Sequence, residues 1–305
     1  MKLQDTPGFV HVTQWLSERQ MTPFAFQVRA WEQLADHRSG LVNAPTGCGK
    51  TYSVFLGALI NFINTHPGDF HLKSNNGLQL CWITPLRALA SDIARAMEEA
   101  INGLGLSWKV GVRNGDTPTS VRQKQKLQMP EILIITPESL HLLLAQKGHA
   151  GLFSSLKIIA VDEWHELLGT KRGVQVELAL SRLVNLESPP PCIWGISATI
   201  GNLEEAREVL LSPLAGLGGQ HGKPRGETIT AKIRKPIRVE SIFPDEIEKF
   251  PWAGHLGIRL IGKVIPIILK SKTTLIFINT RGMSEYWYQA LLDSCPDLAG
   301  QIALH

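Results

Sequence analysis

The chain has 305 residues, of which 44% are apolar and 19% are charged, and its net charge at pH 7 is +4. This composition excludes an intrinsically disordered chain and leaves room for about two globular domains. The apolar runs at residues 54–60 and 264–269 are far shorter than the ~20 residues of a membrane span, and the first residues lack the apolar core of a signal peptide. The four cysteines are scattered, so we expect reduced thiols and neither a zinc site nor disulfides.

An amphipathic helix is predicted in the opening segment, because Phe26, Ala30, Trp31 and Leu34 recur at helical spacing. Gln27 follows an aromatic residue upstream of the loop described next. An aromatic ring and an amide could stack on adenine and hydrogen-bond to its N6 and N7 atoms. A glutamine on the surface of a packing helix explains the same residues equally well, and the local sequence leaves both interpretations open.

Residues 41–51 have the form of a phosphate-binding loop, in which a short apolar strand leads through Gly-x-Gly-Lys-Thr into a helix. Gly47 and Gly49 permit backbone angles and a close approach that a Cβ atom would forbid. Lys50 can place its charge on the β- and γ-phosphates, and Thr51 can offer a hydroxyl to Mg²⁺. The backbone N–H groups of the loop and of the helix start complete an anion site. We assign ATP binding here to Thr46, Gly47, Cys48, Gly49, Lys50 and Thr51. Ala44 stands where the general motif has its first glycine.

Four further apolar runs, at residues 78–83, 132–135, 157–161 and 193–196, alternate with helical stretches. This pattern predicts an α/β fold with a mostly parallel sheet covered by helices on both faces. Polar clusters follow each run, at residues 84–87, 136–139, 162–165 and 197–199. Ligands of such folds bind beyond the carboxyl ends of the strands, so we expect these clusters to form the site.

Asp162 and Glu163 carry the most chemistry among these clusters. A strand that ends in an acidic pair beside a phosphate loop can hold Mg²⁺ through the aspartate, while the glutamate activates the attacking water. An isolated acidic pair is usually a solvated turn, but the apolar strand before it and the upstream loop favour the catalytic interpretation. His165 alone carries little weight, because a lone histidine is more often structural.

The remaining patterns are less specific. A helix at residues 174–186 is expected to turn Val174, Leu178 and Val184 inward. The basic loop before it, at residues 168–173, could touch a phosphate backbone or be merely solvated. We predict a first domain at residues 1–215, a basic Gly- and Pro-rich linker and hairpin at 216–249, and a second unit at 250–305. The second unit should contain a helix at 256–269, a strand at 274–278 and a further helix.

Together these residues resemble the ordered motifs of superfamily 2 helicases. Phe26 and Gln27 resemble the Q motif, and residues 44–51 resemble motif I, in which an initial alanine is normal. Residues 84–89, 136–140, 162–165 and 197–199 resemble motifs Ia, Ib, II of the DExH type, and III. Residues 277–281 resemble motif IV of a second RecA-like domain. The agreement in order and spacing extends over essentially the whole chain.

The residues at 162–175 and 250–255 resemble those of the large helicase-related (Lhr) group, and most of all those of bacterial ligase-associated DEXH-box helicases. This resemblance implies ATP-driven translocation on single-stranded or partly duplex DNA, 3′-to-5′ unwinding and a role in DNA repair. It also implies a monomer in the bacterial cytosol at the nucleoid, near a DNA ligase and a nuclease-like phosphoesterase. ATP and Mg²⁺ are the implied cofactors.

The resemblance also implies roles for individual residues. Gln27 would read adenine, Thr51 and Asp162 would hold Mg²⁺, and Glu163 would be the catalytic base beside Lys50. Coupling of the nucleotide to DNA falls to His165, Ser197 and Thr199. Contacts with nucleic acid fall to Thr84, Arg87, Thr136, Thr280 and Arg281.

Some family elements are absent from these 305 residues, namely motif V, the arginine-finger element Gln-x-x-Gly-Arg-x-x-Arg and the winged-helix domain. We therefore expect the chain to be a fragment or a truncated reading frame that binds ATP·Mg²⁺ but hydrolyses it weakly, because an arginine finger contributes on the order of 10³-fold or more in related reactions. Two alternatives remain open. One is an RNA helicase of the same fold, and the other is a non-enzymatic, ATP-gated DNA-binding fragment.

Overall fold

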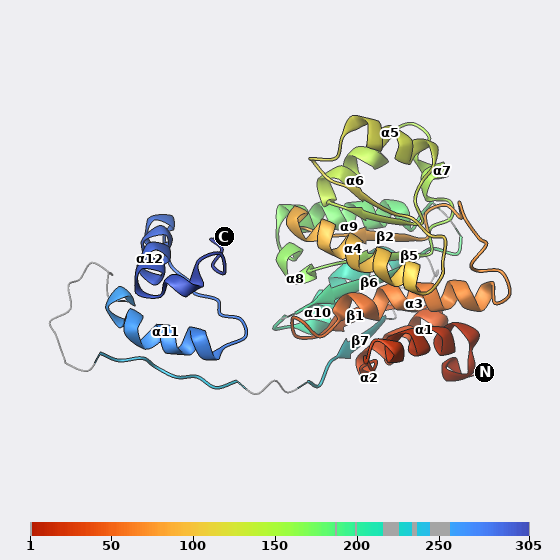
Figure 1. Cartoon of the computed structure of the whole chain (residues 1–305). Helices are drawn as coiled ribbons and strands as arrows, with labels where there is room; N and C mark the ends of the chain where they lie inside the picture. Colours follow the sequence, from red (N-terminus) through yellow and green to blue (C-terminus); the bar gives the residue numbers. More distant parts are fainter. Residues whose placement is uncertain are drawn as a thin grey trace. The chain divides into compact units, whose positions relative to one another are not determined.

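The computed structural model describes residues 2–186, 188–198, 200–215, 226–233, 237–244 and 257–304. The chain divides into two compact units, Met1–Arg234 and Lys235–His305 (Figure 1). The first unit is built on a seven-stranded sheet in the order β3-β4-β2-β5-β6-β1-β7. Every neighbouring pair of strands is parallel, which confirms the predicted fold class. The strands are β1 (Ser39–Asn43), β2 (Leu80–Ile83), β3 (Val110–Arg113), β4 (Ile132–Ile135), β5 (Ile158–Val161), β6 (Cys192–Ser197) and β7 (Gly226–Thr230).

Helices separate most of these strands along the chain. Those of the first unit are η1 (Leu3–Asp5), α1 (Pro7–Glu18), α2 (Ala25–Ala35), α3 (Lys50–Thr65), α4 (Arg87–Gly103), α5 (Thr119–Leu127), α6 (Pro137–Leu144), α7 (His149–Phe153), α8 (Trp164–Leu167), α9 (Lys171–Leu183), α10 (Leu203–Leu211) and η2 (Ser212–Leu214). No helix in the described ranges is both long and apolar enough to cross a bilayer.

The sheet separates two hydrophobic cores, because successive side chains of a strand point to opposite faces. In β2, Leu80 and Trp82 belong to the core formed with α1 to α4. Cys81 and Ile83 belong to the core formed with α6, α9 and α10. Strands buried on both faces read as continuous apolar runs, and for this reason the four runs in the sequence were sufficient to predict β2, β4, β5 and β6.

Two strands were not predicted. In β3 a glycine interrupts a short run whose two valines are only partly buried. Strand β7 lies within the predicted linker and hairpin at residues 216–249, and that interpretation is wrong for residues 226–230. Gly226 pairs with Ser39 and Thr230 with Asn43, so β7 extends the first sheet parallel to β1. Local turn signals cannot reveal a parallel partner almost 190 residues away in the chain, and residues 216–225 lie outside the described part.

The predicted inward face of the helix near residue 174 is wrong at Val174 and Leu178 but right at Val184, which is 1% exposed and follows the last residue of α9. Helix α9 begins earlier, at Lys171, where the Thr170 side chain accepts a hydrogen bond from the backbone N–H of Gly173. The buried face consists of Val176, Leu180 and Leu183, among others, whereas Val174 and Leu178 are exposed. Each residue turns the helix by about 100°, so Val174 and Leu178 lie about 200° around the axis from Val176 and Leu180. Apolar residues therefore occupy both faces of the helix, and only one face meets the core.

The second unit contains η3 (Gly257–Leu260), α11 (Ile261–Lys270), α12 (Arg281–Ser294) and η4 (Pro296–Leu298). The two longer helices match the predicted ones. The predicted strand at residues 274–278 is not formed, and no strand lies beside it within the described residues of this unit. Phe277 is 91% exposed. A strand requires hydrogen bonds from a neighbour, so an apolar run alone does not make one.

The core on the α3 side should dominate the stability of the first unit. Leu59 is completely buried in α3, and Leu59→Ala should lower the free energy of unfolding by about 2–5 kcal/mol, because it removes buried methyl groups and leaves a cavity. Leu72→Ala is the matched control, since Leu72 is 73% exposed and its loss should cost less than about 0.5 kcal/mol. Urea unfolding followed by tryptophan fluorescence measures both variants, and equal losses would contradict this account of the core.

Candidate nucleotide-binding site

The phosphate-loop candidate lies at the carboxyl end of β1 and leads directly into α3. Gly47 and Gly49 have φ values of 76° and 68°, in the left-handed region that favours glycine. A Cβ atom at Gly49 would also lie 2.8 Å from Nε2 of Gln27. The backbone of the loop therefore requires glycine at both positions, as predicted from the sequence. The N-terminus of α3 points its free N–H groups into the loop.

Lys50 and Glu163 approach each other across this loop. Nζ of Lys50 lies 3.9 Å from Oε2 of Glu163, and the lysine side chain is 9% exposed. Both atoms are buried without a hydrogen-bond partner. Buried polar atoms almost always have a hydrogen-bond partner, so an ammonium without one beside glycine-rich backbone marks a place for an anionic ligand. A polyphosphate fits these residues.

Asp162 lies beside this pair, immediately after β5. Its carboxylate accepts hydrogen bonds from Nε1 of Trp82 at 3.3 Å and from the backbone N–H of Glu163 at 3.0 Å. Burial raises the pKa of Asp162 to about 6, and the neighbouring charge of Glu163 adds to the rise. A divalent cation would relieve this cost, because it favours the ionised carboxylate.

The magnesium site that we predict at Thr51 and Asp162 fits the oxygen chemistry of the structure. Thr51 is the second residue of α3 and is partly buried. No group of three or more His, Cys, Asp or Glu residues gathers into a metal site within the described ranges. Mg²⁺ at phosphate sites is usually held by one or two protein oxygens together with phosphates and water, so the sparse set of ligands agrees with such a site.

The backbone of Glu163 is strained. Its φ and ψ are both 46°, the left-handed region that non-glycine residues seldom adopt, at the residue preceding α8. Such conformations cost about 1–3 kcal/mol and collect at functional sites. Oε2 of Glu163 lies 3.5 Å from Nδ1 of His165. The carboxylate is thus held between the Lys50 ammonium and the His165 ring.

His165 also connects this acidic pair to the next strand. Its Nδ1 shares a 3.0 Å hydrogen bond with Oγ of Ser197, the completely buried last residue of β6. The structure therefore brings together two of the three residues predicted to couple nucleotide and nucleic acid. The third, Thr199, lies outside the described residues.

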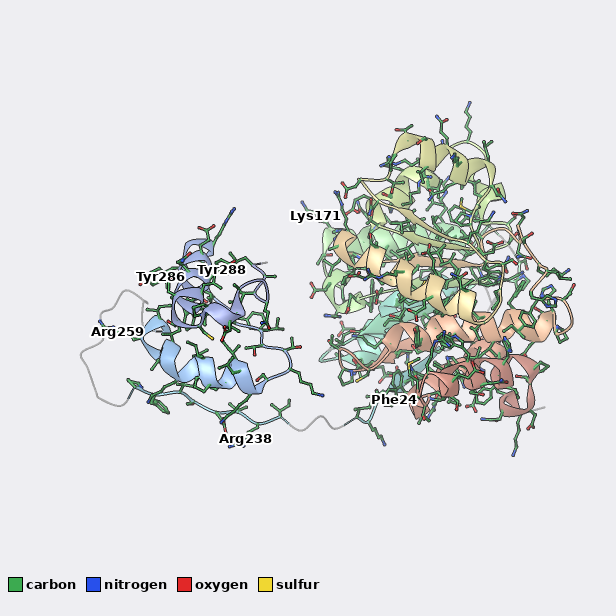
Figure 2. All side chains as sticks on the ribbon, viewed as in Figure 1. Phe24, Lys171, Arg238, Arg259, Tyr286 and Tyr288 are labelled. Carbon is green, nitrogen blue, oxygen red and sulfur yellow. The ribbon has the colours of Figure 1, made fainter. Side chains whose placement is uncertain are left out.

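Gln27 is not a surface glutamine, because its side chain is only 5% exposed. Nε2 donates to the backbone oxygen of Gly49 at 2.8 Å, and Oε1 accepts from the N–H of Phe24 at 2.8 Å. The amide therefore ties α2 to the phosphate loop, and adenine recognition by Gln27 stays a prediction. Phe26 is buried in the core, and its ring stacks on that of Phe24. Phe24, which is labelled in Figure 2, is 44% exposed. The exposed ring that could meet a base is therefore Phe24, which the sequence analysis overlooked.

The predicted nucleic-acid residues do not share one environment. Thr84 is fully buried, and Thr136 is 2% exposed with its hydroxyl bonded to Oγ of Ser139. Both side chains lie where their strands end in the packed sheet edge, and their contact with nucleic acid stays a prediction. Arg87 is exposed, with Nη1 3.3 Å from Oδ1 of Asp116, and remains available to a phosphate backbone.

Thr280 and Arg281 belong to the second unit. Thr280 caps α12 by accepting a hydrogen bond from the N–H of Met283, and Arg281 pairs with Glu285 at 3.1 Å. These contacts account for both residues within their own unit, and their role in binding nucleic acid stays a prediction.

Residues 24–206 match the model of the DEAD/DEAH box helicase family. The chain belongs to this family. The matched range contains the phosphate loop, the acidic pair and the ends of β2, β4, β5 and β6 that surround them.

Helicases of the Lhr type are among the relatives of this DEAD/DEAH box chain. It is 30% identical to the "Lhr helicase/ probable uracil glycosylase" of Mycolicibacterium smegmatis over 293 residues, which cover 89% of this chain and 18% of that protein. It is 34% identical to "ATP-dependent helicase Lhr-Core protein 2" of Thermococcus barophilus over 278 residues, covering 87% of this chain and 31% of the relative. The chain thus spans less than a third of the length of either relative.

Solved helicase structures share the architecture. The Mycobacterium smegmatis helicase Lhr bound to ssDNA and AMP-PNP matches with a TM-score of 0.72 and 26% identity, over 97% of this chain and 37% of that one. The DUF1998 helicase MrfA bound to DNA matches with a TM-score of 0.69 at 22% identity, over 93% of this chain and 38% of MrfA, and this match supports the fold alone.

Ionised Asp162 should destabilise the protein when no ligand is bound. A pKa raised to about 6 in the folded state means that stability is full below the unfolded pKa near 4 and is lost as the pH rises through about 6. Asp162→Asn should therefore raise the free energy of unfolding at pH 7.5 by roughly 1–2 kcal/mol, and the gain should vanish near pH 4. Urea unfolding without Mg²⁺ and nucleotide measures this. Asp92→Asn, at an exposed carboxylate, is the control and should change little at either pH.

Proposed function

We propose that this chain is the nucleotide-binding part of an ATP-dependent, DEXH-type DNA helicase that couples ATP hydrolysis to movement on single-stranded DNA. The observation that carries the proposal is the convergence of Lys50, Asp162 and Glu163 at the phosphate loop, where the charged atoms of Lys50 and Glu163 are buried without a hydrogen-bond partner. Membership of the helicase family and the Lhr-type relatives support the same conclusion.

In this proposal each group at the loop has a task. Backbone N–H groups of residues 47–51 and the Lys50 ammonium would bind the triphosphate, and Thr51 and Asp162 would hold Mg²⁺. When bound, the metal ion neutralises charge on the phosphate oxygens. Lys50 would pair with the phosphates in place of the Glu163 carboxylate, which lies 3.9 Å away. Glu163 would then orient a water molecule and accept its proton.

Communication with nucleic acid would pass through His165. It contacts both Glu163 and Ser197. A shift of the Glu163 carboxylate when nucleotide binds would therefore move His165 and change its hydrogen bond to the end of β6. Gln27 would act at the other side, since its bond to the carbonyl of Gly49 links α2 to the loop conformation. Adenine stacked on the exposed ring of Phe24 would reach the same helix.

DNA is the preferred strand, because the Lhr structure with 26% identity is described as bound to ssDNA. The finer points rest on resemblance to the ligase-associated branch. They are a 3′-to-5′ direction, a role in DNA repair beside a DNA ligase and a nuclease-like phosphoesterase, a monomeric state and a place in the bacterial cytosol at the nucleoid.

Two substitutions should separate nucleotide binding from catalysis. Lys50→Ala should abolish ATP·Mg²⁺ binding measured by calorimetry, because no other charged donor at the loop replaces the ammonium. Glu163→Gln should keep binding within a few-fold and slow hydrolysis by at least about 10²-fold in a form of the protein that turns over ATP. Lys73→Ala, at a half-exposed lysine paired with Asp69, is the control for loss of a charge. Survival of hydrolysis in Glu163→Gln would remove this residue from the role of base.

Matched DNA and RNA strands test the choice of substrate. We expect the chain to bind single-stranded DNA at least as tightly as RNA of the same sequence, because the proposed contacts are to phosphates and none of them reads a 2′-hydroxyl. Fluorescence anisotropy with labelled strands measures both affinities at one salt concentration. A clear preference for RNA would instead favour an RNA helicase of the same fold.

A further inference from the structure

We propose that a groove between α5 and α6 binds a backbone phosphate of the single strand and so extends the strand's path beyond the helicase motifs. This inference rests on the proposed function. The α5–α6 groove is a cavity of about 250 Å³. Its polar lining includes Arg113, Thr119, Arg122, Gln123, Lys126 and Ser139.

The lining carries three cations and no carboxylate. Arg113, the last residue of β3, is 4% exposed, yet Nη1 has only long hydrogen bonds of 3.4 Å to the backbone oxygen of Arg122 and to Oε1 of Gln125. Nε of Arg122 is buried without a partner. Within the described ranges, no carboxylate forms an ion pair with Arg113, Arg122 or Lys126.

A buried guanidinium without a counter-charge is costly, and an anion in the groove would remove that cost. Burial and the nearby charge of Arg122 lower the pKa of Arg113, in agreement with a cation that has no counter-charge beside it. Guanidinium groups bind phosphate through paired N–H donors, and the neighbouring hydroxyl and amide groups can donate as well. The cavity is large enough for a phosphate.

The position of the groove favours a phosphate that belongs to a strand. The backbone oxygen of Arg113 accepts a hydrogen bond from the N–H of Thr136 at 3.3 Å, and the Thr136 hydroxyl bonds to Ser139 in the groove lining. The groove therefore begins at the carboxyl end of β4, where the strand-holding segment is predicted. Residues 117–130 contain three cations and no acidic residue.

Two carboxylates close in the sequence to the groove lining, Glu138 and Asp116, already form ion pairs with other arginines. Glu138 accepts two hydrogen bonds from Arg172, and its pKa is lowered although burial opposes the shift, because Arg172 donates to the carboxylate. Asp116 pairs with Arg87. Neither carboxylate lines the α5–α6 groove, so neither one opposes a phosphate there.

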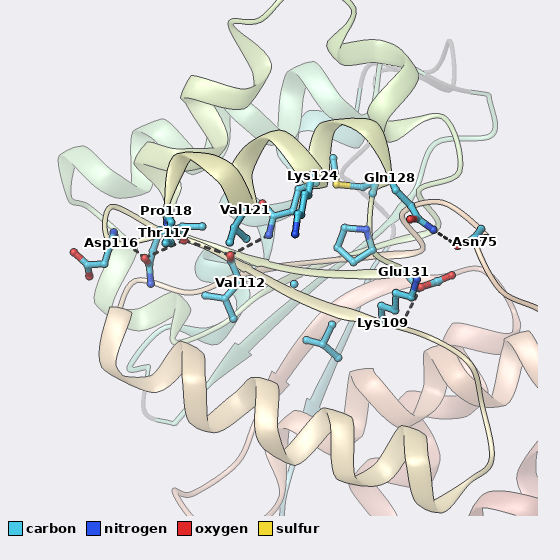
Figure 3. Close-up of a pocket in the computed structure, with 16 residues that line it drawn as sticks. Asn75, Lys109, Val112, Asp116, Thr117, Pro118, Val121, Lys124, Gln128 and Glu131 are labelled. Carbon is cyan, nitrogen blue, oxygen red and sulfur yellow. Dashed lines mark hydrogen bonds between the residues drawn. The ribbon is translucent and has the colours of Figure 1, made fainter.

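Helix α5 supplies its own control. Lys124 lies two residues before Lys126 and faces a different cavity, of about 530 Å³, which it shares with Asp116 and Glu131 (Figure 3). That cavity contains carboxylates, and Glu131 accepts a hydrogen bond from the N–H of Lys109. Reversing the charge at Lys124 or at Lys126 changes the net charge of the same helix equally, but only Lys126 lines the proposed groove.

The test is binding of a labelled oligo-dT strand of about 12 nucleotides to the 305-residue chain, measured by anisotropy over a range of salt concentrations. Lys126→Glu should weaken binding at least about fivefold and lower the slope of log affinity against log salt by about 1. Lys124→Glu should change affinity less than about twofold. Binding of a fluorescent ATP analogue, which reports on the phosphate loop, should be unchanged in both variants.

A second arm identifies the phosphate. Strands that carry one neutral methylphosphonate at successive positions should show a single position whose neutralisation weakens the unmodified chain but not Lys126→Glu. Competition by inorganic phosphate at constant ionic strength, without such a position, would assign the groove to a free anion and overturn the proposal. Equal effects of Lys124→Glu and Lys126→Glu would also overturn it, because binding would then be diffuse. If the unmodified chain fails to bind the strand, the proposed function and this inference fall together, whereas loss of the Lys126 effect alone removes only the groove.

Discussion

The parallel pairing of all seven strands is the constraint on which the site depends. It places the ends of β1, β2, β4, β5 and β6 at one edge, and the backbone ladder continues past those ends. The N–H of Ala44 bonds to the oxygen of Ser197, and the N–H of Asp162 bonds to that of Ile83. The loops that carry the chemistry are therefore fastened to neighbouring strands at their first residue. The phosphate loop and the acidic pair, which are more than 110 residues apart in the chain, therefore reach one site.

This edge carries electrostatic cost that the cores must offset. Lys50 has no hydrogen bond at its ammonium, Asp162 is buried beside a second carboxylate, and Glu163 holds a left-handed backbone. Each arrangement costs on the order of 1–3 kcal/mol, which is large relative to a net stability of about 5–15 kcal/mol. Two tryptophans buried near the site help to hold it. Trp82 donates to Asp162, and Trp164 donates to the backbone oxygen of Ala206.

The sequence was sufficient where the chemistry is local or the burial complete. Strand β4 was predicted with its observed bounds because both of its faces are apolar, and the phosphate loop was predicted because its glycines need positive φ. The failures concern partners that are remote in the chain. Strand β7 becomes a strand only through β1, and residues 274–278 do not become one because no neighbour lies beside them. Burial of Thr84 and Thr136 likewise depends on packing at the sheet edge, which a motif does not encode.

That burial changes how a strand would be held. Because both threonine side chains are buried, the groups proposed to hold a strand include the exposed Arg87 and the cations of the α5–α6 groove. These groups would bind the charged phosphates and not the bases, so binding should be independent of sequence and sensitive to salt. A translocating motor needs this property, because a base-specific contact would trap it at one site. Under the proposed function, Thr136 would serve such a motor indirectly. Its hydroxyl bonds to Ser139 in the first turn of α6 and would so hold one wall of the groove proposed to bind the phosphate.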